Sequence, residues 1–162
     1  MFYLDLFRKL EQHRVRYLLV GGLAMNLHGV PRMTMDIDII LILDDDNLDA
    51  FFKVAKELAL TPSIPVSLND LRDEQLRNSW ISKKNLIVLP LRAKDPHSPT
   101  LDILLSHNLE MNQALANANR VKLGETTVTL ASVSDMIKLK QRAGRKQDIS
   151  DIEQLQKIFD ET

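Results

Sequence analysis

The hydrophobic pattern alternates between short continuous apolar runs and apolar positions at helical spacing. Continuous β-prone runs occupy residues 15–20, 36–43, 86–91 and 100–105, and such runs are typical of buried strands. Leu4, Phe7 and Leu10 instead recur every third residue, which favours a helix near the N-terminus. Strands interleaved with helices predict an α/β fold.

Helical patterns are also expected around residues 23–28, 48–58, 70–80 and 108–118. The proline-containing segments 61–69 and 92–99 are expected to be loops. Two short β-prone runs, RVKL and TTVTL, flank Gly124-Glu125 and predict a hairpin. Together the runs predict a mixed β-sheet of about four or five strands flanked by helices.

The C-terminal residues predict two helices with a break at Gly144. Ser132 and Asp135 fit a capping box at the start of the first helix. Asp148 can cap the second helix, whose apolar residues lie at helical spacing. Farther upstream, Asp44-Asp45-Asp46 reads as a strand end and helix N-cap, where negative charge is favoured.

No Pro/Gly/Ser-rich linker divides the chain, so a single domain over residues 1–162 is expected. Within it, we expect a core at 1–130 and a C-terminal helical extension at 131–162.

Composition and charge exclude several classes of function for this protein. The 162 residues include 21 basic and 22 acidic ones, a net charge of −1, so any contact with nucleic acid requires a local basic patch. The absence of cysteine excludes disulfides, thiolate zinc sites and cysteine nucleophiles. The N-terminal segment lacks a signal-peptide layout, and no apolar run is long enough to span a bilayer. A cytoplasmic protein without a membrane partner is expected.

Asp36 and Asp38 are the first candidates for chemistry. Residues i and i+2 of a strand point to the same face, so the two carboxylates project together from an apolar strand. Their repulsion and desolvation are relieved by a divalent cation, and oxygen ligands suit Mg²⁺ or Mn²⁺. The alternative is that both residues sit at an exposed strand end or cap a turn.

Gly21 and Gly22 add a second feature between an apolar strand and a helix. Glycine permits a sharp bend and a close ligand approach, and a helix start offers free N–H groups to phosphate. A plain tight turn is the alternative. Asp36 follows Gly22 by 14 positions, which leaves room for one helix and a short return segment. That arrangement would bring the glycine turn and the two carboxylates together.

The stretch VGGLAMNLHGVPRMTMDIDI resembles the signature of the nucleotidyltransferase superfamily, the fold of DNA polymerase β. In that family an apolar strand is followed by a glycine turn, a helix, and Asp-x-Asp on the next strand. Gly21 and Gly22 match the turn, and Asp36 and Asp38 match the metal-binding pair. The segment with Gly29, Arg32 and Thr34 is similar to the AbiEii-like, toxin-type bacterial branch.

The resemblance also implies a third carboxylate on a later strand, for which Asp102 in TLDILL is the candidate; a strand-end residue is the alternative. The C-terminal KLKQRAGRKQDISDIEQL is similar to the same branch. Its basic residues could meet a triphosphate or RNA, or form a solvated face or pair with Asp148 and Asp151. The implied nucleotide-binding residues are Gly21, Gly22, Arg32, Thr34, Lys140 and Arg145.

The family therefore implies a metal-dependent enzyme that moves a nucleoside monophosphate from a nucleoside triphosphate to an acceptor. Asp36, Asp38 and Asp102 would be its catalytic metal ligands, for Mg²⁺ or Mn²⁺. The toxin-type branch implies an RNA acceptor, such as tRNA, and an antitoxin partner. The alternative is a catalytically inactive nucleotide-binding or partner-binding protein on the same fold.

Overall fold

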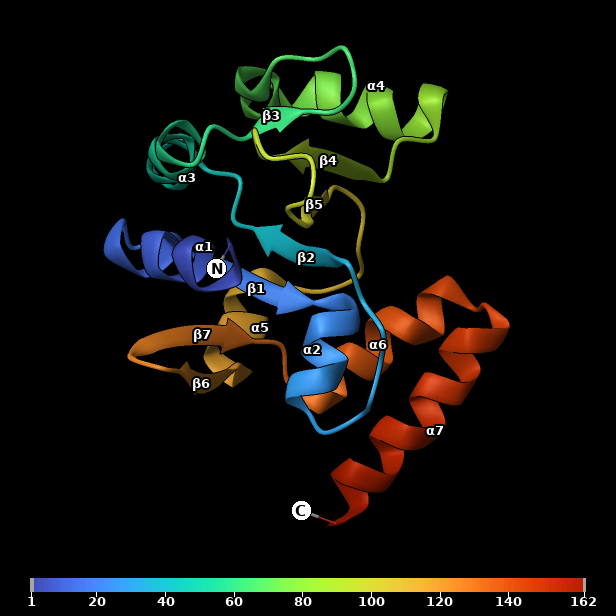
Figure 1. The fold of residues 1–162 in the computed structure, drawn as a ribbon. Helices are drawn as coiled ribbons and strands as arrows, with labels where there is room; N and C mark the ends of the chain where they lie inside the picture. Colours follow the sequence, from blue (N-terminus) through green and yellow to red (C-terminus); the bar gives the residue numbers. More distant parts are fainter. Residues whose placement is uncertain (1, 162) are drawn as a thin grey trace.

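The computed structural model describes residues 2–161, and in them one seven-stranded sheet runs in the order β3-β4-β5-β2-β1-β7-β6 (Figure 1). The strands are β1 (Tyr17–Val20), β2 (Asp36–Leu41), β3 (Thr61–Pro62), β4 (Val88–Arg92), β5 (Thr100–Leu104), β6 (Asn119–Leu123) and β7 (Thr126–Leu130). The sheet is wider than the expected four or five strands. The β6–β7 hairpin joins one edge, and two residues of a segment expected to be loop form β3 at the other.

The helices follow the predicted α/β alternation. They are α1 (Phe2–Gln12), α2 (Gly21–Leu27), α3 (Asp45–Glu57), α4 (Glu74–Lys84), α5 (Met111–Asn117), α6 (Val133–Ala143) and α7 (Lys146–Glu161), with a 3₁₀ helix, η1, at Leu68–Arg72. In Figure 1, α2, α6 and α7 gather near the end of β1, whereas α1 and α3 lie on the opposite side of the picture. No helix among residues 2–161 is both long and apolar enough to cross a membrane.

The sheet is mixed, as expected. β1 pairs with β2 in antiparallel register, and β2 pairs with β5 in parallel register. β4 runs antiparallel to β5 on the outer side. The antiparallel β1–β2 pair places the end of β1 beside the start of β2, so the glycine turn and the first residues of β2 share one end of the sheet.

β2 combines a polar start with a buried remainder. Asp36 is exposed and Asp38 is half-buried, whereas Ile37 and Ile39 are completely buried in the core. This alternation follows the two-residue period of a strand. Burying an Ile or Leu side chain stabilises a fold by about 1.5–3 kcal/mol, so the apolar face fixes the register and the carboxylates must project from the other face.

The predicted caps are formed in part: Asp44 and Ser132 cap α3 and α6, whereas α7 begins at Lys146, so Asp148 lies within its first turn. The Asp44 side chain accepts a hydrogen bond from the Asn47 backbone N–H and caps α3. Ser132 accepts from the Asp135 N–H at the start of α6, and Gly144 ends α6 in the left-handed conformation. Asp148 accepts from the Arg145 N–H beside the start of α7. These caps set the positions at which α6 ends and α7 begins.

Candidate active site

Three carboxylates project from one face of the sheet. In the β2–β5 ladder, Asp38 lies directly opposite Asp102, and Asp36 lies opposite Thr100. Residues that face each other across two strands share a face of the sheet, and Asp36 and Asp38 are two residues apart. The structure therefore brings together the three aspartates that the sequence singled out.

The carboxylates destabilise one another's charged forms. Burial raises the pKa of Asp38 to about 7, with further repulsion from Asp102 and Asp36, while the Lys140 ammonium acts in the opposite direction. Burial and the charge of Asp36 raise the pKa of Asp102 to about 6. A site that disfavours its own negative charges gains free energy when a cation binds there.

The carboxylate oxygens of the three aspartates are suitable for part of the coordination shell of Mg²⁺ or Mn²⁺. Carboxylate oxygens are the ligands these ions prefer, and Mg²⁺ usually takes one or two carboxylates together with water and substrate phosphates. Within residues 2–161, no three acidic or histidine side chains lie close enough together to hold a metal ion, so the three aspartates do not form a complete metal site by themselves. The remaining ligands would have to come from a bound nucleotide and water.

The glycine turn packs directly against these residues. A Cβ atom added to Gly21, which has a φ of +73°, would lie 2.1 Å from Oδ2 of Asp38. A Cβ added to Gly22 would lie 2.9 Å from Cβ and Oγ1 of Thr34. A side chain at Gly21 would overlap Asp38, and one at Gly22 would overlap Thr34, so both positions require glycine. Thr34 is fixed in turn, since its hydroxyl donates to the Asp36 carbonyl oxygen at 3.1 Å.

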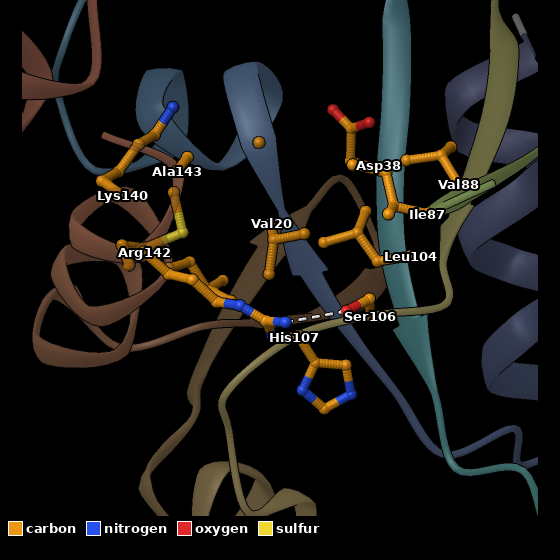
Figure 2. Close-up of a pocket in the computed structure, with 13 residues that line it drawn as sticks. Val20, Asp38, Ile87, Val88, Leu104, Ser106, His107, Lys140, Arg142 and Ala143 are labelled. Atoms are coloured by element: carbon orange, nitrogen blue, oxygen red, sulfur yellow. Dashed lines mark hydrogen bonds between the residues drawn. The ribbon is translucent and has the colours of Figure 1, made fainter. Parts of the chain in front are cut away.

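A pocket of about 340 Å³ opens beside Asp38, between the sheet and α6 (Figure 2). We call it the α6 pocket; its lining residues are Val20, Gly21, Asp38, Ile87, Val88, Leu104, Ser106, His107, Met136, Leu139, Lys140, Arg142 and Ala143. Most of the wall is apolar, and the charged groups stand at its rim. Such a combination suits a ligand with a flat apolar part and a charged part.

Lys140 is held at this rim by two buried carboxylates. Its Nζ lies 3.0 Å from Oδ2 of Asp151 and 3.4 Å from Oδ1 of Asp148. Burial would raise the pKa of Asp148, but hydrogen bonds from Arg145 and the charges of Lys140 and Arg145 outweigh burial and lower it. Asp148 is thus an ionised counter-charge, and α7 supplies it and the second carboxylate, Asp151, to Lys140 of α6.

Arg32 and Arg145 bind to the same two carboxylates. Nη1 of Arg32 lies 2.6 Å from Oδ2 of Asp151, and Nε of Arg145 lies 2.8 Å from Oδ2 of Asp148. The structure therefore joins Arg32, Lys140 and Arg145 in one ion network. The sequence left open that basic residues of the C-terminal stretch pair with Asp148 and Asp151, whereas the bond from Arg32 to Asp151 was not expected. Only Lys140 of the three lines the α6 pocket.

Sequence reasoning did not assign the far wall of this pocket. Arg142 reaches across it to donate to Oγ of Ser106 at 2.9 Å, next to His107 (Figure 2). Burial and the Arg142 charge lower the pKa of His107. Met136 and Leu139 had the helical spacing of ordinary core residues, so no local signal distinguished a pocket wall from a core contact.

Solved structures that resemble this chain include nucleotidyltransferases and a nucleotidyltransferase-like protein. A nucleotidyltransferase-like protein of Paracoccidioides brasiliensis gives a TM-score of 0.59 at 18% identity over 93% of this chain and 71% of that chain. ANT(2″)-Ia, solved with adenylyl-2″-tobramycin, gives 0.57 at 11% over 95% and 85%. A candidate nucleotidyltransferase of Thermotoga maritima gives 0.57 at 14% over 99% and 91%.

No family model matches the chain, and no curated protein is significantly similar to it in sequence. Similarity of structure at such low identity establishes the fold and leaves the substrates open. The mixed sheet, its flanking helices and these neighbours together show that the chain has the nucleotidyltransferase-like α/β fold.

Proposed function

We propose that the protein is a metal-dependent nucleotidyltransferase that moves a nucleoside monophosphate from a nucleoside triphosphate to an acceptor hydroxyl. The observation that supports this proposal most directly is the shared face of Asp36, Asp38 and Asp102 beside the glycine turn. In the reaction, the acceptor hydroxyl gives up its proton to solvent and its oxygen bonds to the α-phosphorus. The bond between the α-phosphorus and the oxygen that bridges to the β-phosphorus breaks, and pyrophosphate leaves.

Asp36, Asp38 and Asp102 would hold Mg²⁺ or Mn²⁺. Such ions neutralise the charge that develops on the phosphate oxygens during an in-line displacement. Gly21 lets the backbone of the turn lie directly against Asp38, because a side chain at this position would overlap the carboxylate. Lys140 adds a positive charge whose position is fixed by Asp148 and Asp151. The protein supplies orientation and charge stabilisation and needs no covalent nucleophile.

The α6 pocket is our proposed seat for the nucleotide. It begins at Gly21, Asp38 and Lys140, where phosphates are expected, and continues along an apolar wall that fits the base and sugar. Gly22 belongs to the glycine turn, and Thr34, on the segment before β2, packs against it. Arg32 and Arg145 remain predicted nucleotide-site residues, and their bonds to Asp151 and Asp148 favour an indirect role through the position of Lys140.

For the acceptor we propose an RNA, such as tRNA, and for the protein a cytoplasmic toxin that an antitoxin restrains. The similarity of residues 29–38 to the AbiEii-like branch motivates this finer proposal. The neighbour bound to adenylyl-2″-tobramycin supports a small-molecule acceptor as the competing hypothesis.

Controlled expression of the wild-type protein in a bacterium should slow growth, whereas expression of the Asp36→Asn/Asp38→Asn form should not. Normal growth with either form would contradict the toxin role.

Metal and nucleotide binding test the enzyme proposal before any acceptor is known. A nucleoside triphosphate with Mg²⁺ should raise the melting temperature of the wild type and should have little effect on Asp36→Asn/Asp38→Asn. The exposed pair Asp45→Asn/Asp46→Asn on α3 serves as a charge-matched control and should respond like the wild type. Equal responses of all three proteins would refute the metal assignment.

Turnover distinguishes the enzyme from an inactive binding protein. Incubation with each labelled nucleoside triphosphate, Mg²⁺ and host RNA and protein should label one acceptor pool. Asp102→Asn should fold normally, and transfer should fall by orders of magnitude. Full activity of Asp102→Asn would show that the third carboxylate is misplaced, and binding without turnover would favour the inactive alternative.

A further inference from the structure

A second pocket, of about 550 Å³, lies at the outer end of β4 and β5. It is formed by the last residue of β4, the first residue of β5, the loop between them and part of β3, and we call it the β4 pocket. Its charged side chains are Arg92, Lys94 and Asp95. No part of the proposed nucleotide site accounts for it.

The sheet register places the β4 pocket on the same face as the carboxylates. Pro90 lies opposite Asp102 in the β4–β5 ladder. Two residues farther along β4, Arg92 therefore shares the face of Asp102 and is level with Thr100, which lies opposite Asp36. Two strand spacings separate Arg92 from Asp36, a distance of about 10 Å between their backbones.

The charges in this pocket are available to a ligand. Arg92 and Lys94 are exposed, and neither forms an ion pair with any residue of the described range 2–161. Asp95 accepts a hydrogen bond from the His97 backbone N–H at 2.9 Å. Its carboxylate charge offsets one of the two positive charges in the pocket. Lys140 and Arg145, by contrast, are already paired with buried carboxylates.

The two pockets lie on opposite sides of Asp102. Along β5, Thr100 lines the β4 pocket, Asp102 follows two residues later, and Leu104 lines the α6 pocket. The α6 pocket is already proposed for the nucleotide. The β4 pocket borders the same carboxylate face at the other end of β5, so it remains available to an acceptor.

We propose that Arg92 and Lys94 bind the phosphate backbone of an RNA acceptor and present its hydroxyl to the carboxylate face; this inference rests on the proposed function. RNA carries a hydroxyl next to a phosphate at every nucleotide, so phosphate contacts about 10 Å from Asp36 are compatible with a hydroxyl at the reacting centre. Two unpaired cations would repel a polycationic acceptor of the tobramycin kind. The proposed binding surface is therefore β4 and the loop after it.

The test compares RNA binding by Arg92→Ala/Lys94→Ala with binding by Lys122→Ala/Lys157→Ala. The control pair removes the same charge from exposed positions on β6 and α7. With a labelled bulk tRNA preparation in low salt, the first variant should bind at least tenfold more weakly than wild type. The slope of its affinity against salt should flatten by about 0.7 per lost contact on a single-stranded segment. The control should lose far less.

Equal losses in the two double variants would overturn the proposal, because they would show that only net charge matters. Unchanged RNA binding together with lost binding of polyglutamate would overturn it in favour of an acidic protein acceptor. Melting temperatures show whether each variant folds, and the response to Mg²⁺ and nucleoside triphosphate should stay at the wild-type level in both. If the wild type itself shows no melting-temperature response to Mg²⁺ and nucleoside triphosphate, the proposed function is refuted, and the RNA-binding measurement still stands.

Discussion

At the scale of single residues, the contact between Gly21 and Asp38 defines the candidate site. The glycine has a positive φ, and its missing side chain leaves the space that Oδ2 of Asp38 occupies. A left-handed φ costs a non-glycine residue roughly 1–2 kcal/mol. The overlap of a methyl group with a carboxylate adds a second cost, so the position combines a conformational and a steric requirement.

We therefore expect Gly21→Ala to lower the free energy of unfolding more than Gly124→Ala does. Gly124 also has a positive φ, but a Cβ there would meet nothing within 4 Å, so this variant measures the conformational cost alone. Overpacking typically adds about 1–3 kcal/mol. Urea denaturation of both variants checks the difference, and equal losses would show that Asp38 moves aside without cost.

At the scale of elements, the position of α6 depends on α7. The buried carboxylates Asp148 and Asp151 come from α7, and they neutralise Lys140 of α6 and Arg32 of the loop before β2. A buried charge without its partner is costly, so these groups stabilise the arrangement only as a set. The network thus connects the C-terminal helix to the rim of the α6 pocket.

Asp151→Ala should destabilise the protein by about 3–5 kcal/mol, since it leaves Lys140 and Arg32 with one carboxylate fewer. Glu153→Ala, an exposed position on the same helix, should change stability by less than about 0.5 kcal/mol. Chemical denaturation measures both values. If Asp151→Ala is as stable as Glu153→Ala, the network contributes nothing to the packing of α7.

At the scale of the whole molecule, the sheet brings together charges that are far apart in the chain. Asp36 and Asp38 belong to β2, and Asp102 belongs to β5, yet the parallel ladder makes them neighbours. Burial and this proximity raise the pKa of Asp38 to about 7 and that of Asp102 to about 6. The assembled site therefore affects how the stability of the protein responds to pH.

In the metal-free protein, the contribution of Asp38 and Asp102 to stability should fall as pH rises from about 4 to about 7, whereas His107, whose pKa is lowered, contributes in the opposite direction. The folded state holds protons on Asp38 and Asp102 in this window, whereas the unfolded state, with pKa values near the usual 3.8, releases them. Asp38→Asn should flatten the decline, and the exposed Asp46→Asn should not. Melting temperatures in a chelating buffer measure the effect. Identical pH profiles of the wild type and Asp38→Asn would contradict the raised pKa of Asp38.

The sequence by itself determined the elements that carry the site. The apolar run of β2, the glycine pair and the caps Asp44 and Ser132 are local signals, because strand period and capping depend on neighbouring residues. The fold class and the hairpin around Gly124-Glu125 followed from the same patterns. The short β3 was missed, since two residues carry no recognisable period.

The tertiary structure decided which of these residues meet. The pairing of β2 with β5 places Asp102 opposite Asp38, and no spacing in the chain specifies that register. The same holds for Lys140, whose partners Asp148 and Asp151 become buried only when α7 packs on α6. The pockets on either side of Asp102 exist because strands and helices from distant segments enclose them. Contacts between distant segments depend on packing and desolvation, which a local pattern does not encode.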